Sequence, residues 1–128
     1  MSSSKGENIS YMAPKHSQCD PLIITRPDGG TFSLDYTFLK RAALTLRALN
    51  HPLRRNILQL VETQKRVTVT EIYVSMRIEQ SVASQHLALL RRAGFLSTER
   101  EGKFIYYTIN KKRLEEITQV VNEIAQPE

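Results

Sequence analysis

The apolar positions in the first long segment of this chain recur at helical spacing. Positions 34, 38, 42, 46 and 49 stand three or four residues apart, which predicts one helix with a single apolar stripe. Ser33 or Asp35 can cap its start. The stripe ends at Asn50-His51-Pro52, because Pro52 disfavours helical geometry at His51 and suits the first turn of a new helix.

Two further helices are expected after the proline. The first has an apolar face at helical spacing, made of Leu53, Ile57, Leu60 and Val61. The second is a short helix that begins after Val67, with Thr68 or Thr70 as its cap. Its interior apolar residues are Ile72, Val74 and Met76.

The fourth predicted helix has the clearest pattern. Gln80 or Ser81 can cap its start, and Gly94 stands where a left-handed C-cap would close it. The spacing i, i+4 and i+7 defines an inward face of Ala83, Leu87 and Leu90. With that face inward, the residues that point outward are Ser81, Ser84, Gln85, Ala88 and Arg92.

The rest of the chain holds two strand patterns, a last helix and a polar N-terminal arm. Residues 95–100 and 103–109 are β-rich, and the two-residue link Glu101-Gly102 between them predicts a tight hairpin. Residues 22–25 and 31–34 suggest two short strands around a Pro-Asp-Gly-Gly turn, with the register left open. Residues 1–19 show no apolar period and suggest a flexible arm. The last helix has one apolar face, made of Leu114, Ile117, Val121 and Ile124.

Length and composition indicate one globular domain. The chain has 128 residues, of which 41% are hydrophobic and 24% charged, and these values exclude wholesale disorder. The longest aliphatic run, residues 87–90, is far too short for a membrane span, and no apolar stretch at the start suggests a secretory signal. The single cysteine, Cys19, excludes an intramolecular disulfide. We therefore expect a cytoplasmic protein with no membrane partner.

Charge is distributed unevenly along the chain. Residues 40–113 hold 15 Lys and Arg against 5 Asp and Glu, whereas the net charge is −1 over residues 1–39 and −4 over residues 114–128. A basic middle with neutral and acidic flanks suggests a module that binds a polyanion. By itself this charge pattern leaves DNA, RNA and an anionic membrane open.

The order of elements indicates the partner. Three short helices, a helix with a polar tip and a hairpin form the winged helix-turn-helix pattern, and a helix fits the DNA major groove. The outward hydroxyls and amide of Ser81, Ser84 and Gln85 suit base edges, and Arg92 suits phosphate. Arg100 and Lys103 lie beside Gly102 at the hairpin tip, where a basic loop would contact the DNA backbone or minor groove. We therefore expect a mainly α fold with a small β-hairpin.

Three motifs in this order resemble the ArsR/SmtB family of bacterial repressors. They are residues 48–58 (ALNHPLRRNIL), residues 80–94 (QSVASQHLALLRRAG) and residues 100–107 (REGKFIYY), within a likeness that spans roughly residues 35–125. The resemblance implies a homodimer that binds a two-fold operator and leaves DNA when an effector, often a metal ion, binds. The family's recognition-helix pattern falls on Gln80, Ser81, Ser84, Gln85 and His86, and its wing pattern on Arg100, Gly102 and Lys103.

The chain departs from this family at its usual metal sites. The third helix has no Cys-x-Cys element in residues 70–75, and residues 111–126 hold neither His nor Asp. His16 and Cys19 stand at i, i+3, but two ligands are too few for a tight site. We therefore expect no metal site and no cofactor, and the effector stays undefined.

The apolar stripes suggest how two copies would pair. We expect a dimer interface built from the first and last helices, because one small domain has too little core to cover both stripes. The expected interface residues are Leu34, Phe38, Ala42, Leu114, Ile117, Val121 and Ile124.

The resulting hypothesis is a sequence-specific DNA-binding transcriptional regulator, a repressor, and not an enzyme. Residues 1–32 form its arm, with a short hairpin, and residues 33–126 its winged helix-turn-helix domain. Ser84 and His86 lie two apart on one helix and point to different faces, so they cannot form a nucleophile–base pair. The alternatives are a repressor of the multiple-antibiotic-resistance (MarR) type and a winged-helix module that binds RNA or a protein.

Overall fold

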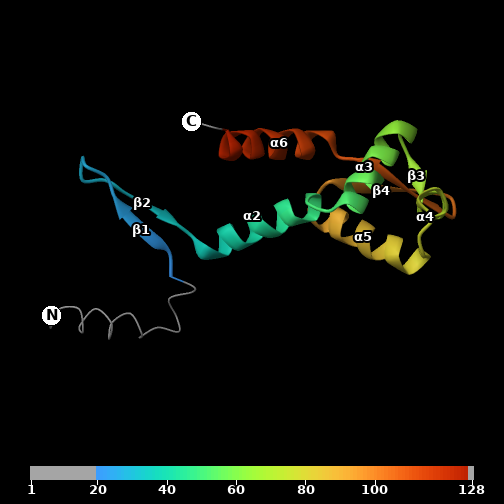
Figure 1. Ribbon diagram of the computed structural model, residues 1–128, viewed down its shortest axis with the longest axis horizontal. Helices are drawn as coiled ribbons and strands as arrows, with labels where there is room; N and C mark the ends of the chain where they lie inside the picture. The colour runs from blue at the N-terminus through green and yellow to red at the C-terminus, as the bar shows by residue number, and fades with distance from the viewer. Residues whose placement is uncertain (1–19, 127–128) are drawn as a thin grey trace. The chain divides into compact units, whose positions relative to one another are not determined.

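The computed structural model describes residues 20–126 (Figure 1), which divide into two compact units. The first unit ends at Leu44 and the second begins at Thr45. Helix α2 (Tyr36–Leu49) continues through this boundary. The expected flexible arm, residues 1–19, lies outside the described residues.

The first unit begins with the two strands that the sequence predicts. Strand β1 (Leu22–Thr25) pairs antiparallel with β2 (Thr31–Leu34), and Leu22 lies opposite Leu34. In the turn between them, Gly29 has a φ of 97°, and the backbone N–H of Gly30 donates to the Asp28 carboxylate over 2.8 Å. The pairing of the two strands is therefore confirmed, and its register is fixed.

Helix α2 starts later than its apolar stripe suggests. The Asp35 carboxylate accepts hydrogen bonds from the backbone N–H groups of Thr37 and Phe38, at 2.8 and 3.4 Å. Of the two predicted caps, Asp35 is therefore the one used. Leu34, which the stripe places on the helix, belongs to β2 instead, because the strand pairing continues up to the residue before the cap. The prediction that Leu34 lies on the helical stripe is therefore wrong.

The second unit holds the hydrophobic core of the described residues. It continues with α3 (Pro52–Gln64), β3 (Val67–Thr68), α4 (Val69–Met76), α5 (Gln80–Arg92), β4 (Leu96–Glu101), β5 (Phe104–Ile109) and α6 (Lys111–Ala125). The core side chains come from almost every one of these elements, and the largest fully buried ones are Phe95, Ile57, Ile72, Leu87, Leu90 and Val61. The predicted inward face of α5 is confirmed, since Ala83, Leu87 and Leu90 are all buried.

Helix α4 is capped at its start by a side chain, and a short turn connects its end to α5. Thr68 caps α4 in a reciprocal arrangement, in which its hydroxyl accepts from the Glu71 backbone N–H and the Glu71 carboxylate accepts from the Thr68 backbone N–H. Arg77 ends α4 in a left-handed conformation with φ 58°. Glu79 is the N-cap of α5 and makes no side-chain cap bond, so the expectation of Gln80 or Ser81 as the cap is wrong. Both of those residues lie in the first turn of the helix.

Gly94 closes α5 as predicted. Its φ is 89°, and the backbone N–H groups of Gly94 and Phe95 donate to the carbonyls of Arg91 and Leu90. These two bonds form the Schellman motif, which satisfies carbonyls that the helix leaves without partners. The chain then turns directly into the buried Phe95 and strand β4.

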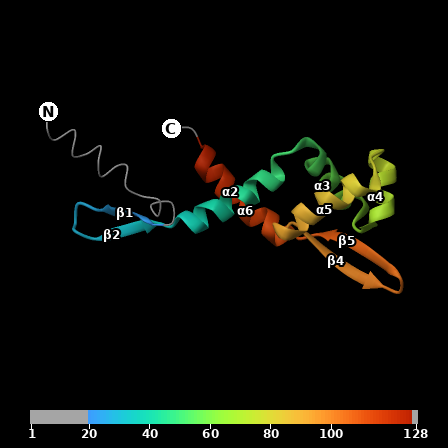
Figure 2. The same cartoon turned by 90° about the horizontal axis from the view of Figure 1, so that it is seen from below.

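A three-stranded sheet in the order β3-β5-β4 carries the predicted hairpin. Strands β4 and β5 pair up to Glu101 opposite Phe104, so the loop residues are Gly102 and Lys103. The predicted link, Glu101-Gly102, is therefore wrong by one residue, because Glu101 still belongs to the ladder. Strand β3 was not expected, and it pairs Val67 with Tyr107. Figure 2 shows the hairpin extending from the helices of this unit.

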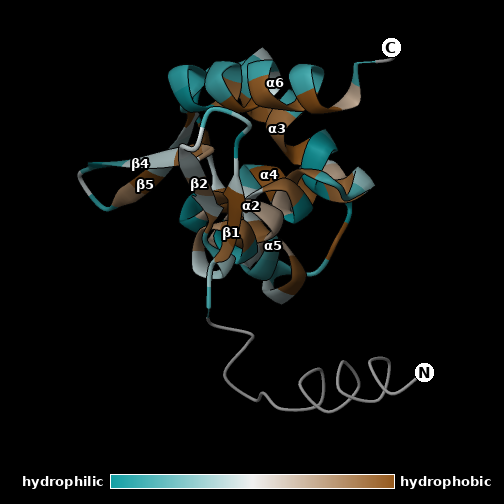
Figure 3. Ribbon diagram, turned by 90° about the vertical axis from the view of Figure 1, so that its left-hand side faces the viewer, coloured by the Kyte–Doolittle hydropathy of each residue, from teal (hydrophilic) through white to brown (hydrophobic). Residues whose placement is uncertain are grey.

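Helix α6 lies on the surface of this unit. Asn110 caps it by accepting from the Arg113 backbone N–H, and none of its residues is fully buried. Leu114 and Ile117 pack against the core, while residues further along the predicted stripe are exposed. Figure 3 shows hydrophobic and hydrophilic positions together along α6. Among residues 20–126, no helix is long and apolar enough to span a membrane.

Candidate nucleic-acid interface

The outward face of α5 is polar and exposed. Ser81, Ser84 and Gln85 are all exposed on the side opposite the buried face, in the first half of the helix. Gln80 is exposed at the first helical position, and Arg92 is exposed in the last turn. The helix therefore presents hydroxyl and amide groups at its beginning and a cation at its end, an arrangement that suits base edges and phosphates respectively.

His86 lies differently from its neighbours on α5. Its side chain is only partly exposed, and its Nδ1 atom lies 3.2 Å from Nη1 of Arg54 on α3. The His51 ring packs beside it, with ring centroids 4.9 Å apart. The structure thus places His86 in an inter-helix contact rather than on the outward row.

Arg54 is a buried cation, with 7% of its surface exposed. Its Nε donates to the Ala48 carbonyl over 2.7 Å, and its Nη2 donates to the Arg47 carbonyl over 2.9 Å. Both carbonyls belong to the last turn of α2, where the helix dipole is negative. The guanidinium is thus stabilised by a helix end and by the ring of His86.

His51 caps α3. Its Nδ1 atom accepts from the Leu53 backbone N–H over 3.1 Å, next to Pro52 in the first turn. Burial lowers the pKa of His86 below its ordinary value of 6.5, and the electrostatic effects of the neighbouring His51 and Arg54 lower that pKa further. The neutral form of His86 is therefore favoured at neutral pH.

The tip of the β4–β5 hairpin carries the predicted basic residues. Arg100, Gly102 and Lys103 are all exposed, and Gly102 has a φ of 65°, which a tight two-residue loop requires. The Lys103 ammonium lies 5.7 Å from the centroid of the Phe104 ring. The structure therefore brings these three residues together at one exposed tip.

A second arginine, Arg66, contacts both strands of the hairpin toward its tip. The Arg66 guanidinium stacks over the Tyr106 ring at 3.8 Å and forms an ion pair with Glu101. The hydrogen bond with Glu101 is the main cause that raises the pKa of Arg66 above its ordinary value. Tyr107, the next residue of β5, packs against the core.

The usual metal ligands of the resembled family have no counterpart here. Within residues 20–126, no group of three or more His, Cys, Asp or Glu side chains is placed to hold a metal ion. Helix α4 (VTEIYVSM) has no thiol, and α6 offers only glutamates as charged oxygen donors. The residues present therefore do not fit either site. His16 and Cys19 lie outside the described residues.

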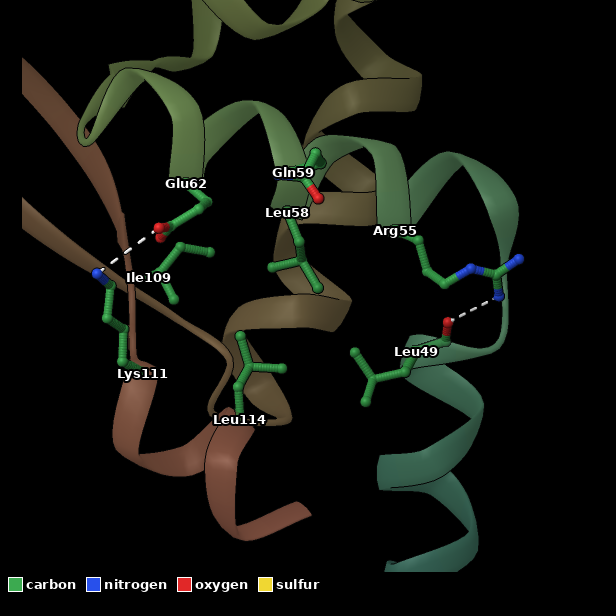
Figure 4. Close-up of a pocket in the computed structure, with 8 residues that line it drawn as sticks. All are labelled: Leu49, Arg55, Leu58, Gln59, Glu62, Ile109, Lys111 and Leu114. Carbon is green, nitrogen blue, oxygen red and sulfur yellow. Dashed lines mark hydrogen bonds and ion pairs between the residues drawn. The ribbon is translucent and has the colours of Figure 1, made fainter. Parts of the chain in front are cut away.

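A shallow pocket of about 520 Å³ opens beside the start of α6 (Figure 4). Its apolar wall is formed by Leu49, Leu58, Ile109 and Leu114. Charged groups line its rim, where Lys111 forms a 3.7 Å ion pair with Glu62 and Arg55 donates to the Leu49 carbonyl over 3.2 Å. The pocket thus lies among the end of α2, the outer side of α3, the end of β5 and the first turn of α6.

The residues expected at a dimer interface differ in exposure. Leu114 and Ile117 are partly buried against their own core. Phe38 is 65% exposed and Ile124 is 71% exposed, while Leu34, Ala42 and Val121 also lie on the surface. Val120 and Leu39 are further exposed apolar residues on these helices, which the periodic stripes did not include.

Sequence reasoning missed the contacts of Arg54 and Arg66. Arg54 follows the predicted proline start by two residues and precedes Arg55, and periodicity alone assigns such a charged side chain to solvent. The signal available was its position next to His51-Pro52, near the end of the preceding helix. Arg66 reaches Glu101 across 35 residues of sequence, and no local pattern indicates that pairing.

Comparison with known proteins also indicates a transcriptional regulator. Residues 51–98, which cover α3 to the start of β4, match the sequence model described as "Bacterial regulatory protein, arsR family". The chain is 34% identical over 91 residues to the transcriptional repressor PagR of Bacillus anthracis, covering 71% of this chain and 91% of PagR. It is 27% identical over 84 residues to the transcriptional activator HlyU of Vibrio cholerae, covering 66% and 77% of the two chains.

Solved structures share the fold. The crystal structure of PagR matches with a TM-score of 0.55 at 34% identity, over 69% of this chain and 100% of that chain. NolR from Sinorhizobium fredii matches with a TM-score of 0.56 at 30% identity, over 73% and 92% of the two chains. The helical fold with its small antiparallel hairpin is therefore that of the winged helix-turn-helix regulators.

Proposed function

Because this chain belongs to the ArsR family of bacterial regulatory proteins, we propose that it represses transcription by binding a two-fold operator as a homodimer. It is a DNA-binding transcriptional regulator and not an enzyme. The observation that carries the operator proposal is the exposed polar row of α5, which stands opposite a fully buried face. Such a helix is held in one orientation by its core and presents groups that can read bases.

Helix α5 is the element that reads sequence in this proposal. Gln80, Ser81, Ser84 and Gln85 contact base edges in the major groove, where hydroxyls and amides distinguish base pairs. Arg92 contacts phosphate at the other end of the helix. His86, the remaining residue of the family's pattern, supports this helix through Arg54 instead of contacting bases.

The hairpin serves as the wing. Arg100 and Lys103 contact the DNA backbone, with Gly102 allowing the close approach of the loop. Arg66 keeps the wing in place through Tyr106 and Glu101. The wing therefore contributes affinity for any duplex, while α5 contributes the preference for one sequence.

Two copies are proposed to pair through α2 and α6. The support is the exposed apolar residues of each unit, which are Leu34, Phe38 and Ala42 in the first unit and Val121 and Ile124 in the second. Leu114 and Ile117 belong to the same face of α6 as Val121 and Ile124, although each is already partly packed. A two-fold pairing would set two recognition helices about 34 Å apart, one turn of DNA.

Repression is proposed because several similar proteins are named as repressors. They include PagR and SdpR, whereas HlyU is named as an activator, so the family contains both outcomes. We also propose a cytoplasmic location, since operator DNA lies there. The effector stays open, because neither metal site of the family has its ligands among the described residues.

The test is selection of bound duplexes from a random pool, followed by binding measurements on the selected duplex, a random duplex and a matched RNA. We expect recovery of a palindromic sequence, bound as two subunits and more tightly than either comparison. Placing that duplex across a promoter in a reporter assay should lower transcription when the protein is supplied. Equal affinity for RNA, or recovery of no preferred sequence, would contradict the proposal.

A further inference from the structure

We propose that Arg54 and His86 form a positioning pair that sets the orientation of α5 against the end of α2, and that protonation of His86 releases this pair. The pair lies behind the exposed row of α5, so it would act on DNA only through the helix. This inference rests on the proposed function, because α5 is the helix assigned to base reading.

Arg54 links three elements through a single buried guanidinium. It lies on α3, donates to two carbonyls in the last turn of α2, and donates from Nη1 to His86 on α5. The two carbonyl contacts, at 2.7 and 2.9 Å, fix the guanidinium plane. The direction of Nη1 toward α5 is therefore set by the end of α2.

The bond between Arg54 and His86 exists in only one protonation state. A guanidinium has donors but no acceptor, so the Nδ1 atom of His86 must accept. A protonated imidazole carries hydrogen on both nitrogens and would direct an N–H group at another N–H group. Protonation therefore converts the contact from attraction to repulsion.

The groups that face the His86 ring strengthen this effect. They are Arg54 from α3 and His51 from the residue before α3, and both are bases. Burial is the first cause that lowers the pKa of His86 below 6.5, and these two groups add to it. The folded protein therefore binds this proton less readily than the unfolded chain, so acid favours any state in which the pair has opened.

The sign of the expected pH effect separates this proposal from simple electrostatics. A proton gained near a polyanion adds positive charge and by itself strengthens DNA binding. Release of the positioning pair instead weakens operator binding as the pH falls below about 6.5. The loss reaches at most about tenfold per pH unit for each His86 that titrates.

The experiment measures the affinity of the full chain for a fluorescent duplex, selected from a random pool at pH 8, between pH 5.5 and 8 at constant ionic strength. His86→Asn keeps an acceptor near the position of Nδ1 but does not titrate. We expect its affinity to equal the wild type at pH 8 and to stay constant in acid. His86→Ala should bind more weakly at every pH.

His51 supplies the matched control. The chain has three histidines, and His51→Asn keeps an acceptor for the α3 cap. Under the proposal this variant retains the acid-dependent loss, as does His16→Asn. Arg54→Lys should weaken binding at pH 8, because one ammonium cannot make the three hydrogen bonds of the guanidinium in the same geometry. Circular dichroism should show that this variant keeps the fold.

A wild-type affinity that is constant or rises toward pH 5.5 would overturn the proposal, as would the same pH dependence in His86→Asn. Nitrogen-15 spectra of the free protein test the pair without DNA. They should show an unprotonated Nδ1 at pH 8, and α5 amide shifts should titrate with the His86 ring. A proton on Nδ1 at pH 8 would also overturn the proposal. Failure to select any duplex at pH 8 contradicts the DNA function alone.

Discussion

At the residue scale, the proposed interface separates side chains that read bases from side chains that hold the backbone. Gln85 is exposed near the start of α5, where its amide can donate and accept together to an adenine. Lys103 lies at the exposed tip of the wing, where its charge matters and sequence does not.

We expect Gln85→Ala to weaken binding to the selected operator by about 1–3 kcal/mol and to leave binding to a random duplex nearly unchanged. Lys103→Ala should weaken binding to the operator and to the random duplex about equally. It should also make the slope of log affinity against log salt concentration shallower by about one unit for each phosphate that the variant no longer neutralises. Titrations against both duplexes across a salt series measure these effects.

Gln119→Ala, on the exposed face of α6, is the matched control for removal of a surface amide and should change neither affinity. If Gln85→Ala and Lys103→Ala behaved alike on both duplexes across the salt series, the assignment of helix to bases and wing to backbone would be wrong.

At the element scale, the position of α5 depends on the short helix before it. Helix α4 has only eight residues, and its first turn is stabilised by the reciprocal bonds of Thr68 and Glu71. Short helices gain little from propensity, so such a cap contributes a large share of their local stability.

We expect Thr68→Ala to lower the free energy of unfolding by about 1 kcal/mol, because a backbone N–H at the start of α4 loses its acceptor. Thr70→Ala, two residues further along the same turn and exposed, should change it by much less. Urea unfolding followed by circular dichroism measures both. An equal loss in the two variants would show that the cap bond contributes nothing specific.

At the scale of the whole molecule, large apolar side chains on two helices are exposed. The exposed apolar residues on α2 and α6 include Phe38, Leu39, Val121 and Ile124. Exposed apolar residues of this kind are typical of association sites, and a symmetric pair of subunits would cover them.

We expect the wild type to be a dimer by light scattering at micromolar concentration and the double variant Val121→Lys, Ile124→Lys to be a monomer. The reason is that two charges per subunit would have to be buried at the interface. Gln119→Lys adds a charge to α6 away from the stripe and should remain dimeric. A monomeric wild type would refute the proposed pairing.

Zinc should neither bind tightly to the molecule nor release it from operator DNA. The reason is that α4 and α6 lack the thiol and imidazole ligands of the family's two sites. Calorimetry with zinc, and operator binding with and without it, test this expectation. A stoichiometric site with sub-micromolar affinity would contradict it, and His16→Ala and Cys19→Ala would then show whether the N-terminal arm holds the ion.

The order of the elements and the exposed row of α5 followed from the sequence because the signals are local. Helical spacing defined the buried face of α5, Pro52 marked the start of α3, and Gly94 marked the end of α5. The side chains that share one face of a helix are set by their spacing along the chain. The buried face can therefore be predicted from the sequence without knowing which other elements it packs against.

Tertiary structure alone decided the contacts between elements and the exact ends of some of them. The pairing of β3 with β5 and the one-residue shift of the hairpin loop depend on register between distant segments. The link from Arg54 to His86 spans 32 residues and requires a buried cation to find neutral acceptors on two other elements. Periodicity assigns charged side chains to solvent, because burial of a charge is costly unless the fold supplies partners. Those partners exist only once α2, α3 and α5 have packed.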